Sequence, residues 1–144
     1  MRERLFFVLI WSLIILVATC TNDAAAFLFD QKIGFSFNLT PDFTEFLRFD
    51  DIDFSYSFYA IQKTGHFLSF ALLYVLVLIW LKKRETAFMV TAAFGLFTEI
   101  LQLFFERDGR LFDAGIDILG ILLAYIVCRM YADGKAPVKN SYYP

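Results

Sequence analysis

Hydrophobic residues along this chain gather in long runs, and most polar residues lie between those runs. Apolar stretches of helical length predict four helices, at about residues 5–22, 62–81, 86–105 and 111–131. A bilayer core is about 30 Å thick, so a helix needs about 20 mostly apolar residues to cross it. The strictly apolar parts of the first two runs are shorter than this, so these helices must include flanking residues if they cross the membrane. We expect an all-α integral membrane four-helix bundle, with residues 1–144 as a single domain.

Composition agrees with this pattern. Hydrophobic residues make up 59% of the chain, which contains 19 phenylalanines, and the mean hydropathy is positive. A soluble domain normally has a smaller apolar share. We therefore predict a multi-pass protein of the bacterial plasma membrane. A basic start before an apolar run also describes a secretory signal peptide, but we favour retention of the first run as a membrane helix.

The distribution of basic residues predicts an orientation, because cationic loops are retained in the cytoplasm. With the N-terminus inside, the inner flanks hold most of the lysines and arginines: Arg2, Arg4, Lys82, Lys83, Arg84, Arg129, Lys135 and Lys139. Most acidic residues then lie at or beyond the outer face. We expect both termini to be cytoplasmic. Cys20 and Cys128 then lie near opposite faces, which excludes an intramolecular disulfide.

The segment 23–61 is expected to form an extracytoplasmic loop rich in Phe and Asp. Thr40 and Pro41 are typical of a helix start, and the residues after them have helical apolar spacing, so we predict a short amphipathic helix on the outer interface. A lid or a partner-docking surface is the alternative. Carboxylates bind divalent cations, but for the cluster Asp50, Asp51 and Asp53 we favour a solvated acidic loop. Asn38, Leu39 and Thr40 match the acceptor sequence for N-glycosylation, but a match of three residues is weak evidence.

Polar side chains inside the last three apolar runs form pairs that share a helical face. The predicted topology places all three pairs at one depth in the outer leaflet, and two arginines lie in the turn between the last two helices. An ionised side chain at a helix centre costs about 2.5–3.5 kcal/mol on insertion scales. We therefore infer a polar pocket between the second, third and fourth helices. The pairs are Lys63 and His66, Glu99 and Gln102, and Asp113 and Asp117, and the arginines are Arg107 and Arg110.

Three interpretations fit this set. In the first, the cations neutralise the acids and the polar residues are interhelical contacts that hold the bundle together. In the second, the pocket binds a lipid headgroup, with cations as phosphate contacts. In the third, the protein is an enzyme with a general base and an acidic partner. The candidate catalytic residues are His66, Glu99, Asp113 and Asp117, and the candidate binding residues are Lys63, Gln102, Arg107 and Arg110.

Other chemistries find little support. A metal site built from His66, Glu99, Asp113 and Asp117 is a variant of the enzyme interpretation, but their spacing matches no standard ligand motif. No nucleotide fingerprint or Ser-His-Asp set is present, and the turn 107–110 is too short and mixed in charge for nucleic acid. We predict no cofactor, no resident metal and no nucleic acid, with a membrane lipid or lipid-linked envelope precursor as partner.

The polar pattern resembles the VanZ-like family of small polytopic bacterial membrane proteins, named for an accessory factor in teicoplanin resistance. The family shows Lys-x-x-His-Phe, then Glu-x-x-Gln, an Arg, and Asp-x-x-x-Asp/Asn-x-x-Gly. The same order and spacing recur here from Lys63 to Gly120. The resemblance implies an envelope membrane protein, connected in some members to glycopeptide tolerance, and supplies no reaction. Phe70 stands where the family often has Tyr, and either Arg107 or Arg110 fits the family arginine.

Overall fold

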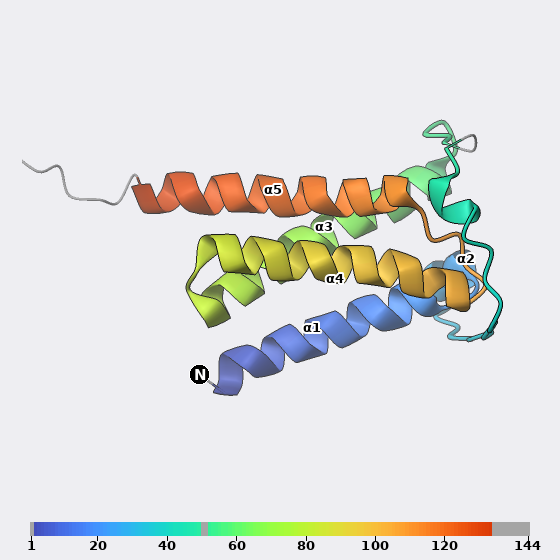
Figure 1. Cartoon of the computed structure of the whole chain (residues 1–144), viewed down its shortest axis with the longest axis horizontal. Helices are drawn as coiled ribbons and strands as arrows, with labels where there is room; N and C mark the ends of the chain where they lie inside the picture. Colours follow the sequence, from blue (N-terminus) through green and yellow to red (C-terminus); the bar gives the residue numbers. More distant parts are fainter. Residues whose placement is uncertain (1, 50–51, 134–144) are drawn as a thin grey trace, which may run out of the picture.

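The computed structural model describes residues 2–49 and 52–133, and helices dominate it (Figure 1). Within these residues there is no strand, which confirms the predicted all-α class. The elements are α1 (Arg2–Cys20), α2 (Ala24–Asp30), the 3-10 helix η1 (Glu45–Leu47), α3 (Ser57–Leu81), α4 (Arg84–Phe104) and α5 (Leu111–Asp133).

The four long helices lie side by side as one bundle (Figure 1). At one end are the start of α1, the turn from α3 to α4, and the last turn of α5. At the other end, called the loop end below, lie α2, η1 and the turn from α4 to α5. Both ends of the described chain therefore lie at the same end of the bundle. Four crossings of a membrane require this arrangement, whichever side faces the cytoplasm.

All four long helices have the length and apolar composition needed to cross a membrane. Their outer faces carry exposed aliphatic side chains along most of their length, such as Leu13, Leu119, Leu123 and Met130. Exposed apolar surface of this extent would drive aggregation in water, whereas lipid tails cover it at no such cost. The protein is a multi-pass membrane protein.

Helix α3 occupies the middle of the bundle and packs against α5, α1 and α4, most extensively against α5. Glycine permits the close approach of α5, because a Cβ on Gly120 would lie 2.1 Å from the backbone oxygen of Phe67. On the other side of α3, the indole Nε1 of Trp11 donates a hydrogen bond to the Ser69 carbonyl oxygen at 3.0 Å. The apolar core lies around α3: Val8, Ile15, Phe70, Leu73, Tyr74, Val77, Ala87, Ile121 and Ala124.

The loop between α1 and α3 differs from the prediction in its helical content. The predicted helix start at Thr40 is wrong, since η1 begins at Glu45 and has Thr44 as its N-cap residue. An additional helix, α2, begins after Asp23, whose side chain accepts a hydrogen bond from the Ala26 amide at 2.8 Å. Helix α3 also begins earlier than expected, at Ser57.

Aromatic contacts fix the loop over the end of α4. The ring of Phe37 lies 5.4 Å from the Phe105 ring, and the rings of Phe37 and Phe104 stack at 6.4 Å. Nearby, the Asn38 amide donates to the Phe104 carbonyl oxygen at 2.8 Å.

The acidic cluster lies only partly within the described residues, because Asp50 and Asp51 fall outside them. The Asp53 carboxylate accepts hydrogen bonds from Ser55, which lower the Asp53 pKa. Its Oδ1 accepts both bonds and is thus engaged in a local turn. Cys20 and Cys128 are free, as predicted.

Candidate functional site

Lys63 and Asp113 form a buried ion pair that joins α3 to α5. The Lys63 Nζ lies 2.6 Å from the Asp113 Oδ1 and 2.7 Å from its Oδ2, and the side chains are only 7% and 5% exposed. The same ammonium lies 4.5 Å above the centre of the Tyr59 ring, one helical turn before Lys63. The lysine that the sequence places at a helix start is therefore neutralised within the bundle.

His66 lies one turn deeper, against acids from two other helices. Its Nδ1 is 3.1 Å from the Asp117 Oδ1 on α5 and 3.7 Å from the Glu99 Oε1 on α4. Both carboxylates have no solvent-exposed surface. A histidine hydrogen-bonded to a buried carboxylate is an arrangement used in general acid–base catalysis.

Glu99 also connects α4 to the start of α5. Its Oε1 accepts a hydrogen bond from the Gln102 Nε2 at 2.7 Å, and its Oε2 accepts one from the Arg110 backbone amide at 3.1 Å. The turn comes close enough for this because residue 109 is glycine, where a Cβ would lie 2.0 Å from the Glu99 carbonyl oxygen. The carboxylate orientation is therefore fixed by two donors.

Arg107 connects the same turn to the end of α1. Its Nη1 donates a hydrogen bond to the carbonyl oxygen of Thr21 at 2.7 Å. Burial lowers the pKa of the Arg107 guanidinium, because desolvation penalises its charge. An anion beside this group would offset that penalty.

Two cavities meet at Arg107. The first, called the apolar cavity, has a volume of about 320 Å³ and lies between α1, α2 and α3, with His66 and Gly65 in its lining. The second, called the polar cavity, has a volume of about 370 Å³ and lies at the loop end. It is lined by charged residues of α3, α5 and the turn before α5: Lys63, Glu106, Arg107, Asp108, Arg110 and Asp113.

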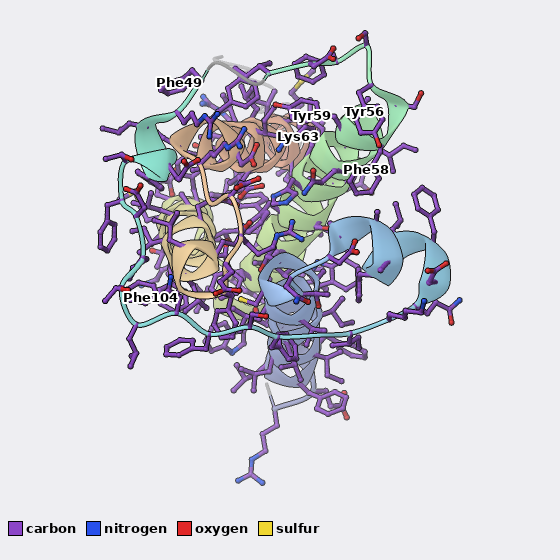
Figure 2. The ribbon with its side chains drawn as sticks, turned by 90° about the vertical axis from the view of Figure 1, so that its right-hand side faces the viewer. Phe49, Tyr56, Phe58, Tyr59, Lys63 and Phe104 are labelled. Carbon is purple, nitrogen blue, oxygen red and sulfur yellow. The ribbon has the colours of Figure 1, made fainter. Side chains whose placement is uncertain are left out.

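Both cavities share part of their lining, namely Ala24, Phe58, Gln62 and Arg107, so they adjoin. Figure 2 looks onto the loop end of the bundle. Lys63 and Tyr59 lie together near α3 and α5, whereas Phe58 points from α3 toward α2. Phe58, which lines both cavities, therefore lies on the α2 side of α3.

The structure divides the eight predicted site residues into groups. Four of them line the polar cavity: Lys63, Arg107, Arg110 and Asp113. His66 lines the apolar cavity, and the remaining three, Glu99, Gln102 and Asp117, are buried between helices and line neither. The expected pairing of cations with acids is found for Lys63 and Asp113, whereas Asp117 contacts His66.

Sequence analysis missed α2 and the end of α1 as parts of the site. The backbone oxygen of Thr21 holds Arg107, and α2 contributes Ala24 and Phe27 to the apolar cavity. A signal for α2 was available, because Asp23 followed by three alanines is a capping residue before strong helix formers. No comparable signal marks Thr21, since its contribution is a backbone atom.

Comparison with known proteins identifies the family of this chain. The sequence model of the VanZ/LLP1 family matches residues 5–132, nearly the whole described chain. The chain belongs to the VanZ/LLP1 family. The match includes α1 and the loop, which the polar motif alone does not reach.

A curated relative of this chain is the uncharacterized membrane protein YwnJ of Bacillus subtilis (strain 168). It is 37% identical over 118 residues, which cover 80% of this chain and 82% of the relative. Its name agrees with the membrane assignment. The comparison with solved structures found no significant match.

Proposed function

We propose that this VanZ/LLP1 protein binds one membrane lipid or lipid-linked cell-wall component at the loop end of its bundle. The hydrocarbon chain would occupy the apolar cavity, and the headgroup would occupy the polar cavity. The observation that carries this proposal is that the two cavities adjoin and share Arg107. An elongated molecule with one apolar and one charged part matches such a pair of cavities.

Arg107 is the cation of the polar cavity that favours a headgroup containing phosphate. The other charged lining residues are the cations Lys63 and Arg110 and the acids Asp23, Glu106, Asp108 and Asp113, so the assignment rests on Arg107 and not on the net charge of the cavity. Asp113 is neutralised by Lys63, and Asp108 lies 3.5 Å from the Arg110 guanidinium. Asp23 is engaged in capping α2. Arg107 is half-buried and reaches both cavities, and arginine binds phosphate through two parallel hydrogen bonds.

A substitution at Gly65 tests the apolar part of this proposal. Gly65 lines the apolar cavity and has no atom within 4 Å of an added Cβ, so Gly65→Leu introduces a side chain at the cavity wall with free space around its Cβ. We expect the purified variant to retain much less lipid than the wild type in native mass spectrometry. Gly115→Leu is the matched control, because Gly115 is equally open but lies outside both cavities. Equal lipid retention by all three proteins would exclude the apolar cavity as the binding site.

A structural role is the second candidate, favoured by a specific observation. Each buried acid on α4 and α5 contacts a group from another part of the chain: Lys63 for Asp113, His66 for Asp117, and the Arg110 amide for Glu99. Such contacts hold α3, α4 and α5 together without any ligand. Under this candidate, alanine at Glu99 or Asp113 lowers protein abundance in the membrane, whereas a binding role predicts loss of function at normal abundance.

Two further parts of the proposal concern the cell. We place the loop end on the outer face of the membrane. An impermeant thiol reagent should therefore label Asp108→Cys on intact cells and should not label Lys83→Cys. The reverse labelling pattern would overturn this orientation.

We also propose a link to teicoplanin tolerance, as the family resemblance implies. A deletion strain with unchanged tolerance would refute that link for this member.

A further inference from the structure

Three side chains capable of binding a metal ion converge where α3, α4 and α5 meet. One ligand atom from each of His66, Glu99 and Asp117 lies within 4.8 Å of the others. The His66 Nδ1 is central to the group, at 3.1 Å from Asp117 and 3.7 Å from Glu99. Sequence analysis named these three among four possible metal ligands but predicted no resident metal, because their spacing along the chain matches no standard ligand motif.

With both carboxylates ionised and no cation bound, this group carries a net negative charge. Glu99 and Asp117 are both fully buried, and the imidazole between them supplies at most one positive charge. Lys63 is engaged by Asp113, and the Arg107 Nη1 is engaged by Thr21. The second oxygen of Asp117, Oδ2, is buried and has no hydrogen-bond partner among the described residues. A divalent cation would neutralise both carboxylates and leave His66 neutral, the form in which it binds metals.

The ligand distances indicate which cation fits. Tetrahedral Zn²⁺ with bonds of about 2.0–2.1 Å places neighbouring ligand atoms about 3.3–3.4 Å apart. The distances of 3.1 and 3.7 Å bracket that value. Octahedral Mg²⁺ requires neighbouring ligands about 2.9 Å apart and prefers oxygen, and Ca²⁺ takes six to eight oxygens. Imidazole in the set favours Zn²⁺ over both.

The surroundings hold the ligands in place. Glu99 is oriented by hydrogen bonds from Gln102 and from the Arg110 amide, the kind of outer contact that fixes a metal-binding carboxylate. His66 lines the apolar cavity, so the ligand group borders that cavity. Asp113 is excluded from the ligand set because it is engaged by Lys63.

We propose that His66, Glu99 and Asp117 form a binding site for one Zn²⁺ ion at the junction of α3, α4 and α5. The ion joins three helices and lies next to the apolar cavity. Three protein ligands leave the fourth tetrahedral position for water or an oxygen of a bound molecule. This site does not depend on lipid binding, and the two proposals can fail separately.

Metal analysis of the purified full chain tests this site. After chelator treatment and re-addition of ZnCl₂, elemental analysis should find one Zn²⁺ per chain, and zinc should raise the thermal midpoint where MgCl₂ does not. Glu99→Gln and Asp117→Asn keep the side-chain size and should weaken zinc binding by at least about tenfold. Asp108→Asn is the control, because Asp108 is an exposed carboxylate at the same end and should not affect binding.

The wild-type protein keeps the test decisive if a variant fails to fold. Co²⁺ bound in place of Zn²⁺ should give the ligand-field spectrum of a four-coordinate site with nitrogen and oxygen ligands. Less than one equivalent of zinc after dialysis, a six-coordinate cobalt spectrum, or folded Glu99→Gln and Asp117→Asn variants that keep their zinc would overturn the site. Gly65→Leu should retain zinc even where it loses lipid, which separates this proposal from the proposed function.

Discussion

Lys63 and Asp113 show how individual charges are accommodated inside an apolar bundle. Inserting either charge alone into the membrane costs free energy. Together the two residues form an ion pair with Nζ–O distances of 2.6 and 2.7 Å. Sequence analysis predicted that both residues belong to one polar group, because they begin neighbouring inward-going helices. It could not predict which acid meets which base, since that depends on the rotation of α3 against α5.

Breaking this pair should destabilise the protein strongly, whereas removing both charges should not. Lys63→Met leaves Asp113 buried without its cation and should lower the free energy of unfolding by about 3–5 kcal/mol. In Lys63→Met/Asp113→Val no charge remains unpaired, and stability should return to near the wild-type value. Unfolding in mixed micelles measures both effects. If the double variant loses as much stability as Lys63→Met and Asp113→Val added together, the two residues are not energetically coupled.

At the scale of helices, the contact between α3 and α5 depends on a small residue. Gly120 and Ala124 lie four residues apart on α5, a small-residue spacing that permits close helix approach, and both are buried. The position of the contact was not predictable, because the partner atom is the backbone oxygen of Phe67. Helix α2 was missed for a different reason, since the helix-start signal at Thr40 and Pro41 led to a predicted helix in the later part of the loop.

Gly120→Ala should therefore force the two helices apart. The added Cβ would lie 2.1 Å from the Phe67 oxygen and 2.9 Å from its carbonyl carbon, and neither is a flexible side-chain atom. We expect a loss of about 1–3 kcal/mol, typical of overpacking, measured as a lower thermal midpoint in detergent. Gly115→Ala, on the same helix with no atom within 4 Å of its Cβ, should leave stability unchanged or slightly raised. Equal effects of the two substitutions would contradict the close packing at Gly120.

At the scale of the whole molecule, apolar runs were sufficient to predict a helical membrane protein with four crossings. Long segments of uniform hydropathy produce that signal, and side-chain detail does not affect it. The cavities were not predictable in the same way, since they depend on how α2 lies against α1 and α3. Sequence analysis proposed Arg107 as a site candidate, but it could not predict that Arg107 lines both cavities and donates a hydrogen bond to Thr21.

The central claim is that the adjoining cavities bind one lipid through Arg107, and lipid selectivity at this residue tests it most directly. Arg107→Gln keeps a donor for the Thr21 carbonyl oxygen but removes the positive charge. In nanodiscs that contain both phosphatidylglycerol and an uncharged glycolipid, we expect the wild type to bind phosphatidylglycerol preferentially.

The variant should bind phosphatidylglycerol about tenfold more weakly, the loss expected for one charge-assisted hydrogen bond. Arg48→Gln serves as the control, since Arg48 pairs with Glu45 on the exposed loop and lines neither cavity. Loss of phosphatidylglycerol binding in Arg107→Gln alone is the result that the account predicts. Unchanged affinity in Arg107→Gln, or no preference for phosphatidylglycerol in the wild type, would contradict it.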